Sequence, residues 1–399
     1  MDESLSHARV EAALQHREPD RVPIDVNPHV ELYAALKRYL GLEIDEDLQP
    51  NKAMEVVPHP KVLQALGIDL ISVKLRSPHQ RLLQRLNADL VEDPWGVGWK
   101  KVTQPTAGSY LEPVYHPLAN ATLSDLANYP WPDPSLPGRD DGLAETAQSL
   151  CEDTGLALVG RFGGPIVETA LYLVGWEEWL VRVAADPVFA GELLDRIADI
   201  QIALDQIGLE ATAPYLTIYK ASGEDLGMQT GPLYSPRMFE EILLPRLRRR
   251  WDAAHALLER LDSQAHLMLH SCGGIRPFIP DLIEAGVQVL DPIQPQATGM
   301  EATALKRDFG TQLTFHGGVD IQHVLPYGSP ADVEAEVCRC LLALGSGGGY
   351  ILAPAHAVQP DVPPVNVATM CQAAQRWGRY PLDRSELERV RCSTEKQPA

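Results

Sequence analysis

The sequence has no long apolar run and no regular framework of cysteines. No stretch approaches the roughly 18 uninterrupted apolar residues of a membrane-spanning helix, so we expect no membrane partner. The first residues, MDESLSHARVEAAL, lack the basic and apolar regions of a secretory signal. The six cysteines are scattered without framework spacing. This pattern favours free or metal-bound thiols in a reducing cytoplasm.

Basic residues are also scarce. Lys and Arg number 34 against 54 Asp and Glu, which gives a formal net charge of -20 and a pI near 5.0. Nucleic acids and anionic membrane surfaces are bound through basic patches, so neither is expected as a partner. The one dense basic run, residues 246–250, falls inside a helical pattern. We interpret it as a solvated face or a helix-end cluster.

What the sequence does contain is an alternation of short aliphatic runs with long amphipathic patterns. Such runs are typical of parallel strands buried on both faces, each followed by a helix. The candidate strands are residues 21–26, 70–75, 156–162, 215–220, 265–270, 287–292, 312–317 and 349–354. Eight such units in 399 residues predict an α/β fold, a single (β/α)8 TIM-type barrel.

One segment interrupts this rhythm. Residues 95–116 indicate short antiparallel strands, and residues 129–139 (YPWPDPSLPGR) are proline-rich and irregular. We interpret residues from about 92 to 140 as an insertion in an early βα connection that covers one side of the barrel mouth. Its aromatic side chains either pack against the barrel or line a substrate pocket. The barrel then spans residues 1–380, and the polar residues 381–399 form a loosely held C-terminal tail.

A histidine and a cysteine stand together where the fifth predicted strand ends. His270 and Cys272 are two positions apart, so in extended chain they point the same way, and two glycines follow them. Imidazole and thiolate are both good zinc ligands. His356 and His316 also follow predicted strands, at the end of a barrel where active sites form. We predict a metal site of His270, Cys272 and His356, with His316 facing the substrate; a buried core cysteine and a hydrogen-bonded histidine are the alternative.

A second polar stretch, residues 219–229, follows the fourth predicted strand. Its adjacent carboxylates, Glu224 and Asp225, are suited to orient a histidine ligand or to act as a general base. Helix capping is the alternative for both. Further substrate-binding candidates at strand ends are Asp25, Asn27, His29, Tyr219, Gln229 and Asp320, although for Asp320 helix capping is the favoured interpretation.

Longer motifs extend over nearly the whole chain. They are RVEAAL at 9–14 with EPDRVP at 18–23, YPWPDP at 129–134, residues 227–236, HSCGG at 270–274 and residues 348–364. With these motifs the sequence resembles the uroporphyrinogen decarboxylase superfamily, particularly its cobalamin-linked (corrinoid) methyltransferase branch. The resemblance covers about residues 8–378 and implies the barrel fold.

The resemblance also implies a cofactor set. In the methyltransferase branch a His-x-Cys pair and a later cysteine bind zinc, which activates a thiol. Methyl groups pass between that thiol and a corrinoid, often carried on a small partner protein. The pair matches His270 and Cys272, whereas the later cysteine falls at His356, a residue that is itself able to bind zinc. By the same resemblance, the decarboxylases proper carry an RQAGRY-type run near the N-terminus and no His-x-Cys pair. In this sequence the corresponding residues 26–30 read VNPHV instead. The late histidine, His356, is however a feature that the decarboxylases share.

These inferences lead to one expected function and two alternatives. We expect a cytoplasmic, zinc-dependent methyltransferase that moves a methyl group between a corrinoid and a thiol or a methylated small molecule, as part of a demethylase system. The first alternative is a decarboxylase or another lyase acting on a carboxylated substrate. The second is a barrel that binds a corrinoid or tetrapyrrole without turnover. By resemblance, either a monomer or a homodimer is expected.

Overall fold

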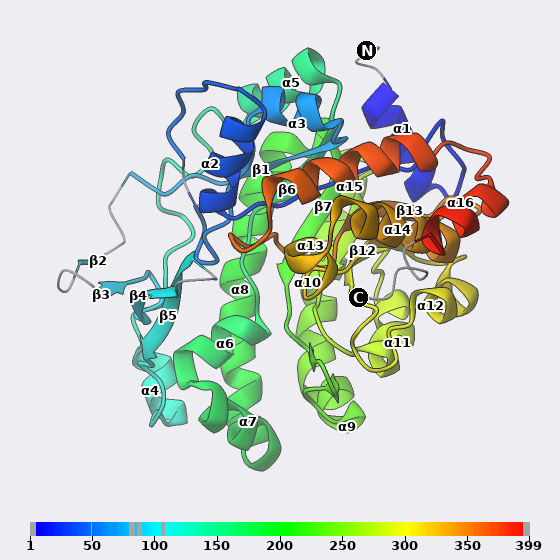
Figure 1. Cartoon of the computed structure of the whole chain (residues 1–399). Coiled ribbons are helices and arrows are strands. Elements are labelled where there is room, and N and C mark those ends of the chain that lie inside the picture. Colours follow the sequence, from blue (N-terminus) through cyan, green and yellow to red (C-terminus); the bar gives the residue numbers. More distant parts are fainter. Residues whose placement is uncertain (1–4, 49, 80–83, 86–89, 105–107, 394–399) are drawn as a thin grey trace.

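The computed structural model describes residues 5–393, apart from 49, 80–83, 86–89 and 105–107. A curled parallel sheet carries helices around its outside, which confirms the α/β barrel-type architecture (Figure 1). Across the sheet the strands are β1 (Leu70–Lys74), β6 (Ala157–Arg161), β7 (Leu216–Gly223), β10 (His266–His270), β11 (Val289–Ile293), β12 (Thr314–Val319) and β13 (Tyr350–Pro354). All neighbouring pairs are parallel, so the carboxyl ends of the strands meet at one end of the barrel.

The first predicted strand, residues 21–26, is wrong as a strand. This segment makes only isolated bridges, among them a parallel one from Ile24 to Leu352 of β13. Pro23 has no N–H to donate, and the Ile24 N–H donates to the buried Asp69 carboxylate (2.9 Å) rather than to a neighbouring strand. The segment still lies at the eighth position, because the Asp25 N–H donates to the Leu352 carbonyl and the Asp69 N–H donates to the Ile24 carbonyl.

Two groups of apolar side chains form the core. The smaller group fills the inside of the barrel, where Leu70, Val159, Ile218, Met268, Val289 and Ile351 each come from a different strand of the sheet. Val10 and Leu14 of α1 (Leu5–Leu14) belong to the same group. Because α1 contributes to the interior and its Ala13 carbonyl accepts from the Gly349 N–H just before β13, it closes the amino-terminal end of the barrel. The opposite end is left for a site.

The larger group of apolar side chains lies between the strands and the outer helices. Within the described residues, none of the helices combines the length and apolar character that crossing a bilayer requires. The remaining helices are α2 (Val30–Tyr39), α3 (Pro60–Leu66), α4 (Leu123–Asn128), α5 (Leu143–Thr154), α6 (Val167–Val174), α7 (Trp176–Ala185), α8 (Pro187–Thr212), α9 (Pro236–Met238), α10 (Leu244–Arg260), α11 (Ile279–Glu284), α12 (Ala302–Phe309), α13 (Val324–Tyr327), α14 (Pro330–Cys340), α15 (Pro364–Trp377) and α16 (Arg384–Arg391).

A small antiparallel sheet lies between β1 and β6 in the sequence and to one side of the barrel (Figure 1). Its strands are β2 (Gln84–Arg85), β3 (Leu90–Glu92), β4 (Gly98–Gln104) and β5 (Gly108–Tyr115). The antiparallel strands predicted within 95–116 are therefore confirmed as β4 and β5. The sheet begins earlier than the expected insertion, at Gln84.

The basic run at 246–250 is only partly a solvated face. Arg250 is almost fully buried, and its guanidinium donates to both carboxylate oxygens of Asp205 in α8 (2.6 and 3.1 Å). It also donates to the Gly164 carbonyl (2.6 Å), in the loop that precedes α6. The interpretation of this run as solvated is thus wrong for Arg250, which lies on the face of α10 that packs on α8.

The expected loose tail after residue 380 is also corrected, because residues 384–391 form α16. Asp383 caps this helix by accepting hydrogen bonds from Ser385 N–H and Glu386 N–H. Leu387 is buried in the main core, and the helix packs against α14. Residues 394–399 lie outside the described part of the chain.

Replacing Leu387 by alanine is expected to lower the free energy of unfolding by about 2 kcal/mol. The change removes buried methyl groups and leaves a cavity under α16. Because α16 packs at the edge of the fold, the helix is able to move partly into this cavity, which limits the loss of stability. Urea denaturation of Leu387→Ala measures the effect, with exposed Glu388→Ala as the matched control. Equal stability of the two variants would show that α16 adds nothing to the fold.

Candidate active site

A cavity of about 660 Å3 opens at the carboxyl ends of the strands. The sheet and its following loops supply many of the polar residues of its lining: Arg161, Lys220, Asp225, His270, Asp291, His316 and His356. The inserted sheet and α6 supply Trp95, Trp99, Tyr110, Glu168 and Tyr172. Aromatics of the insertion therefore do line the cavity. Its size suits a small-molecule ligand.

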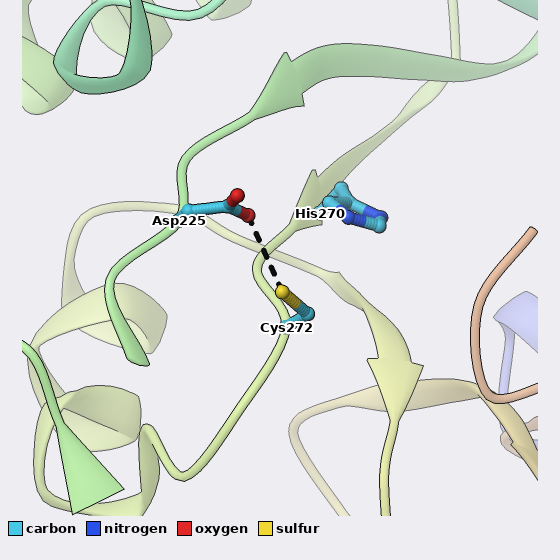
Figure 2. A group of neighbouring side chains, drawn as sticks. All are labelled: Asp225, His270 and Cys272. Carbon is cyan, nitrogen blue, oxygen red and sulfur yellow. Dashed lines mark hydrogen bonds between the residues drawn. The ribbon is translucent and has the colours of Figure 1, made fainter. Parts of the chain in front are cut away.

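Three potential metal ligands converge beside this cavity. One ligand atom each from Asp225, His270 and Cys272 lies within 4.8 Å of the other two. His270 ends β10, and Asp225 follows β7, its neighbour in the sheet. Figure 2 shows Asp225 and Cys272 joined by a hydrogen bond, in which the thiol donates to a carboxylate oxygen (Sγ to Oδ1, 3.4 Å), with His270 alongside.

The chain turns sharply after this group. Gly273 has φ of +82°, and a Cβ there would lie 2.5 Å from the Gly227 carbonyl carbon. Only glycine allows both the left-handed conformation and this close approach. The turn brings Cys272 back to the loop that carries Asp225, which explains why the two residues meet.

The buried carboxylate of Asp291, in β11, contacts three other side chains of the site. One of its oxygens, Oδ2, faces His270 Nδ1 (2.8 Å) and accepts from Lys220 Nζ (2.6 Å). The other, Oδ1, faces His316 Nδ1 (2.6 Å). Burial opposes ionisation of Asp291, but Lys220, His316 and His270 outweigh it and hold its pKa well below the ordinary value. A carboxylate at His270 Nδ1 makes that nitrogen the donor and leaves Nε2 as the free acceptor.

His316 is a buried cation in this arrangement. Its Nε2 faces Asp25 Oδ2 at 3.0 Å, so both ring nitrogens meet carboxylate oxygens. Burial lowers the pKa of His316, but Asp291 and Asp25 outweigh burial and raise it to about 9. His316 lines the cavity, and its charge is balanced by these two carboxylates; its facing a substrate stays a prediction.

This shift predicts a pH dependence of stability. The pKa of His316 is higher in the folded chain than in the unfolded one, so its contribution is complete below about pH 6.5 and is lost as the pH rises through about 9. We expect the free energy of unfolding to fall over this range by an amount on the order of 3 kcal/mol from this group. His316→Gln should remove that part of the slope in urea titrations, whereas His79→Gln, at an exposed position, should keep it. Parallel pH profiles for wild type and His316→Gln would contradict the assignment.

His356 lines the same cavity but stands apart from the three converging ligands. Its ring centroid is 5.9 Å from that of His270, and it is not within the group whose ligand atoms approach to 4.8 Å. Burial and the neighbouring His270 lower its pKa, which favours the neutral imidazole that a metal requires. The structure thus places Asp225 beside the predicted His-x-Cys pair, and His356 as a ligand stays a prediction.

A second acidic residue faces the cavity from α6. Glu168 accepts a hydrogen bond from the Tyr172 hydroxyl one turn later. Burial and Asp225 raise the pKa of Glu168 to about 7. Burial, Asp225 and Glu168 also raise the pKa of the Cys272 thiol well above its ordinary value. Glu168, Asp225 and Cys272 are therefore three acidic groups whose full ionisation the surrounding side chains do not favour.

Glu224 has a different place from its neighbour Asp225. It is fully buried, and its carboxylate accepts from the Ile166 and Val167 N–H groups (2.7 Å each) at the start of α6. Burial raises its pKa to about 8. The capping alternative fits Glu224, since it positions α6 and does not line the cavity.

The other predicted substrate-binding residues are dispersed. Asn27 lines the cavity, and Asp25 reaches it only through His316. His29 caps α2 and faces the Ser109 carbonyl of the inserted sheet (Nε2 to O, 2.9 Å). The remaining three lie outside the lining: Tyr219 is buried in the core, Gln229 is exposed, and Asp320 accepts from the Gln322 and His323 N–H groups.

Sequence reasoning gave no role to Asp291, Lys220, Glu168 or Tyr172. A usable signal existed for the first two, because each places a charge in a strand that is otherwise apolar, VLDPI and LTIYK. A charge in a buried strand requires a partner. Glu168 and Tyr172 are four apart on α6 and resemble any pair on one helix face, so nothing in the sequence distinguishes them.

Comparison with known families assigns the chain to one of them. A family model described as uroporphyrinogen decarboxylase (URO-D) matches residues 87–377. The chain belongs to the uroporphyrinogen decarboxylase family. It is therefore a member of an enzyme family, and the resemblance inferred from the motifs is confirmed.

Relatives within this family are distant. The uroporphyrinogen decarboxylase of Xanthomonas oryzae pv. oryzae (strain PXO99A) is 25% identical over 392 residues, covering 93% of this chain and 99% of the relative. That of Edwardsiella ictaluri (strain 93-146) is 26% identical over 270 residues, covering 63% and 68%. Among solved structures, a methyltransferase from Methanosarcina mazei matches with a TM-score of 0.59 at 18% identity, covering 93% of this chain and 98% of that one. The uroporphyrinogen decarboxylase family and this methyltransferase thus share the fold.

Proposed function

We propose that this family member is a zinc-dependent methyltransferase that moves a methyl group between a corrinoid and a thiol or a methylated small molecule. The observation that carries the proposal is the convergence of Asp225, His270 and Cys272 at the cavity. The corrinoid is presented by a partner protein, and the small molecule binds in the cavity.

The residues present suit zinc in type and in charge. Thiolate, imidazole and carboxylate are all zinc ligands, and three protein ligands leave a position open for a substrate. Without a cation, burial and the nearby carboxylates disfavour the charged forms of Cys272 and Glu168 and raise the pKa values of both groups. A dication relieves this repulsion. His356, neutral and on the same cavity wall, is available as a further ligand.

Bound zinc would supply a lowered pKa for a coordinated thiol, so that the thiolate is present at neutral pH. The protein's own residues do the rest. Asp291 fixes His270 with Nε2 as its acceptor nitrogen, and Lys220 and His316 keep Asp291 ionised. Glu168, with a pKa near 7, is suited to hold or release a proton at its carboxylate. Trp95, Trp99 and Tyr172 give the cavity an aromatic lining.

Decarboxylation of a porphyrinogen, the activity named for the relatives, is less well supported here. A substrate with many carboxylates requires unpaired cations. Among the described residues lining the cavity, the Lys and Arg side chains are each paired: Lys52 with Asp93, Arg161 with Glu55 and Lys220 with Asp291. A decarboxylase acting on a smaller carboxylated substrate is the outcome to consider if zinc is not found.

The test is to measure zinc and methyl transfer on the purified protein. We expect about one zinc per chain by elemental analysis and transfer between methylcobalamin and a thiol, lost on chelation and restored by zinc. His356→Ala then decides whether that residue is a ligand, because it should lower zinc occupancy only if it is one. A protein that binds no zinc under any of these conditions would rule out the proposal and point to an acid–base site with Glu168 and His316.

A further inference from the structure

The positive and negative side chains around the cavity do not all form pairs. One carboxylate, that of Glu168, is left without a close Lys or Arg partner among the described residues. The Lys and Arg side chains that line the cavity are paired as described above, and the Lys220–Asp291 and Arg161–Glu55 pairs lie on the barrel side. In the proposed function the two positive charges of zinc are balanced by the Cys272 thiolate and the Asp225 carboxylate. Among the described residues, Glu168 then remains as a lining carboxylate with no Lys or Arg within ion-pair distance.

Aromatic rings adjoin this carboxylate. Tyr172 donates its hydroxyl proton to Glu168, and its ring packs edge-on against Trp99 with centroids 4.9 Å apart. Both rings line the cavity, together with Trp95 and Tyr110. The faces of such rings carry partial negative charge and attract cations within about 6 Å of the centroid.

An ammonium group of the protein itself, that of Lys52, lies against two of these aromatic rings. Lys52 Nζ lies 4.4 Å from the Trp99 ring centroid and 5.8 Å from that of Tyr172. Its counter-ion is Asp93 (Nζ to Oδ2, 2.5 Å), which in turn accepts from the Trp99 ring N–H (2.9 Å). Trp99 thus carries a cation on its face. Among the described residues Glu168 has no such cation within ion-pair distance, and Lys52 and His270 act on its charge only from farther away.

We propose that the wall formed by Glu168, Tyr172 and Trp99 binds a small methylated ammonium ion, and that this cation is the substrate class of the site. The identity as substrate rests on the proposed function, whereas binding itself does not. Such an ion places its methyl groups against the rings and its charge beside Glu168. A neutral ligand of the same shape gains only the apolar contact, and an anion is repelled by Glu168.

The experiment compares ligands that differ in charge but not in shape. Binding of choline, neutral 3,3-dimethylbutan-1-ol and anionic 3,3-dimethylbutanoate is measured by calorimetry on the full chain, once with added zinc and once without, and in both cases without corrinoid. We expect choline to bind at least about tenfold more tightly than the alcohol, and the anion to bind most weakly. Glu168→Gln keeps the side-chain shape and an oxygen acceptor for Tyr172. It should remove the advantage of choline and leave the alcohol unchanged.

Glu177→Gln, at an exposed position in α7, is the matched control and should bind choline like wild type. Unchanged alcohol binding by Glu168→Gln also verifies that this variant is folded. Equal affinity for choline and the alcohol, preference for the anion, or no binding of any of the three would overturn the inference. Zinc content and methyl transfer to a thiol are measured separately. If the protein binds zinc and transfers methyl groups but does not prefer choline, this inference fails and the proposed function stands. If the protein prefers choline but has neither zinc nor methyl transfer, the ammonium site is supported and the proposed function fails.

Discussion

Cys272→Ser is expected to bind zinc at least about a hundredfold more weakly than wild type and to lose methyl transfer in proportion. Cys272 supplies the one thiolate of the converging group, and its Sγ lies 3.4 Å from Asp225 Oδ1. Serine is nearly isosteric but is a far poorer zinc ligand, because its hydroxyl stays protonated at neutral pH. Changing a residue that only supports a ligand already costs 10–100-fold in metal affinity, so loss of a direct ligand should cost more.

Competition with a chelator of known affinity measures the zinc constants. Cys151→Ser is the matched control, because Cys151 is similarly half-buried but belongs to α5 and does not line the cavity. The control should keep wild-type zinc and activity. Full zinc occupancy in Cys272→Ser would mean that the cysteine is a packing residue, the alternative that the spacing alone leaves open.

Asp291→Asn is expected to cost about 3–5 kcal/mol of unfolding free energy and to weaken zinc binding by about 10–100-fold. The amide fits the same space but carries no charge. Lys220 and His316 would then be left buried with less counter-charge, and His270 would lose the carboxylate that fixes its ring. No other described strand residue contacts all three groups.

Two measurements separate these effects. Urea unfolding of the zinc-free protein gives the stability cost, and chelator competition gives the zinc affinity. Asp252→Asn on the exposed face of α10 should change neither. If Asp291→Asn is as stable as the control, then Lys220 and His316 are not held as cations by this carboxylate.

Much of the barrel was predictable because strands buried on both faces have apolar sequences. Seven of the predicted runs correspond to strands of the sheet. The eighth failed because residues 21–26 satisfy their hydrogen bonds differently, with Pro23 lacking a donor and Ile24 bonded to Asp69. Asp69 is distant in sequence, so its role there could not be seen from the local pattern. The same applies to Arg250, whose burial depends on Asp205 in another helix.

The site was predictable where a short spacing holds the residues together. His270 and Cys272 are two apart at a strand end, and Asp225 lies in a polar loop at the end of the neighbouring strand. Which of two adjacent carboxylates faces the cavity was not predictable: it depends on α6, whose first N–H groups bind Glu224. The aromatic wall depends on how the inserted sheet packs, which no local pattern encodes.

The closure of the barrel's amino-terminal end by α1 has a consequence for how the chain matures. Val10 and Leu14 share one apolar cluster with Ile351, so α1 completes its packing only after β13, the last strand of the described sheet in chain order, has been made. Contacts this far apart in sequence form late and slow folding. A nascent chain that stops short of residue 350 has an unsealed interior and exposed strand edges, which makes such fragments natural clients for chaperones.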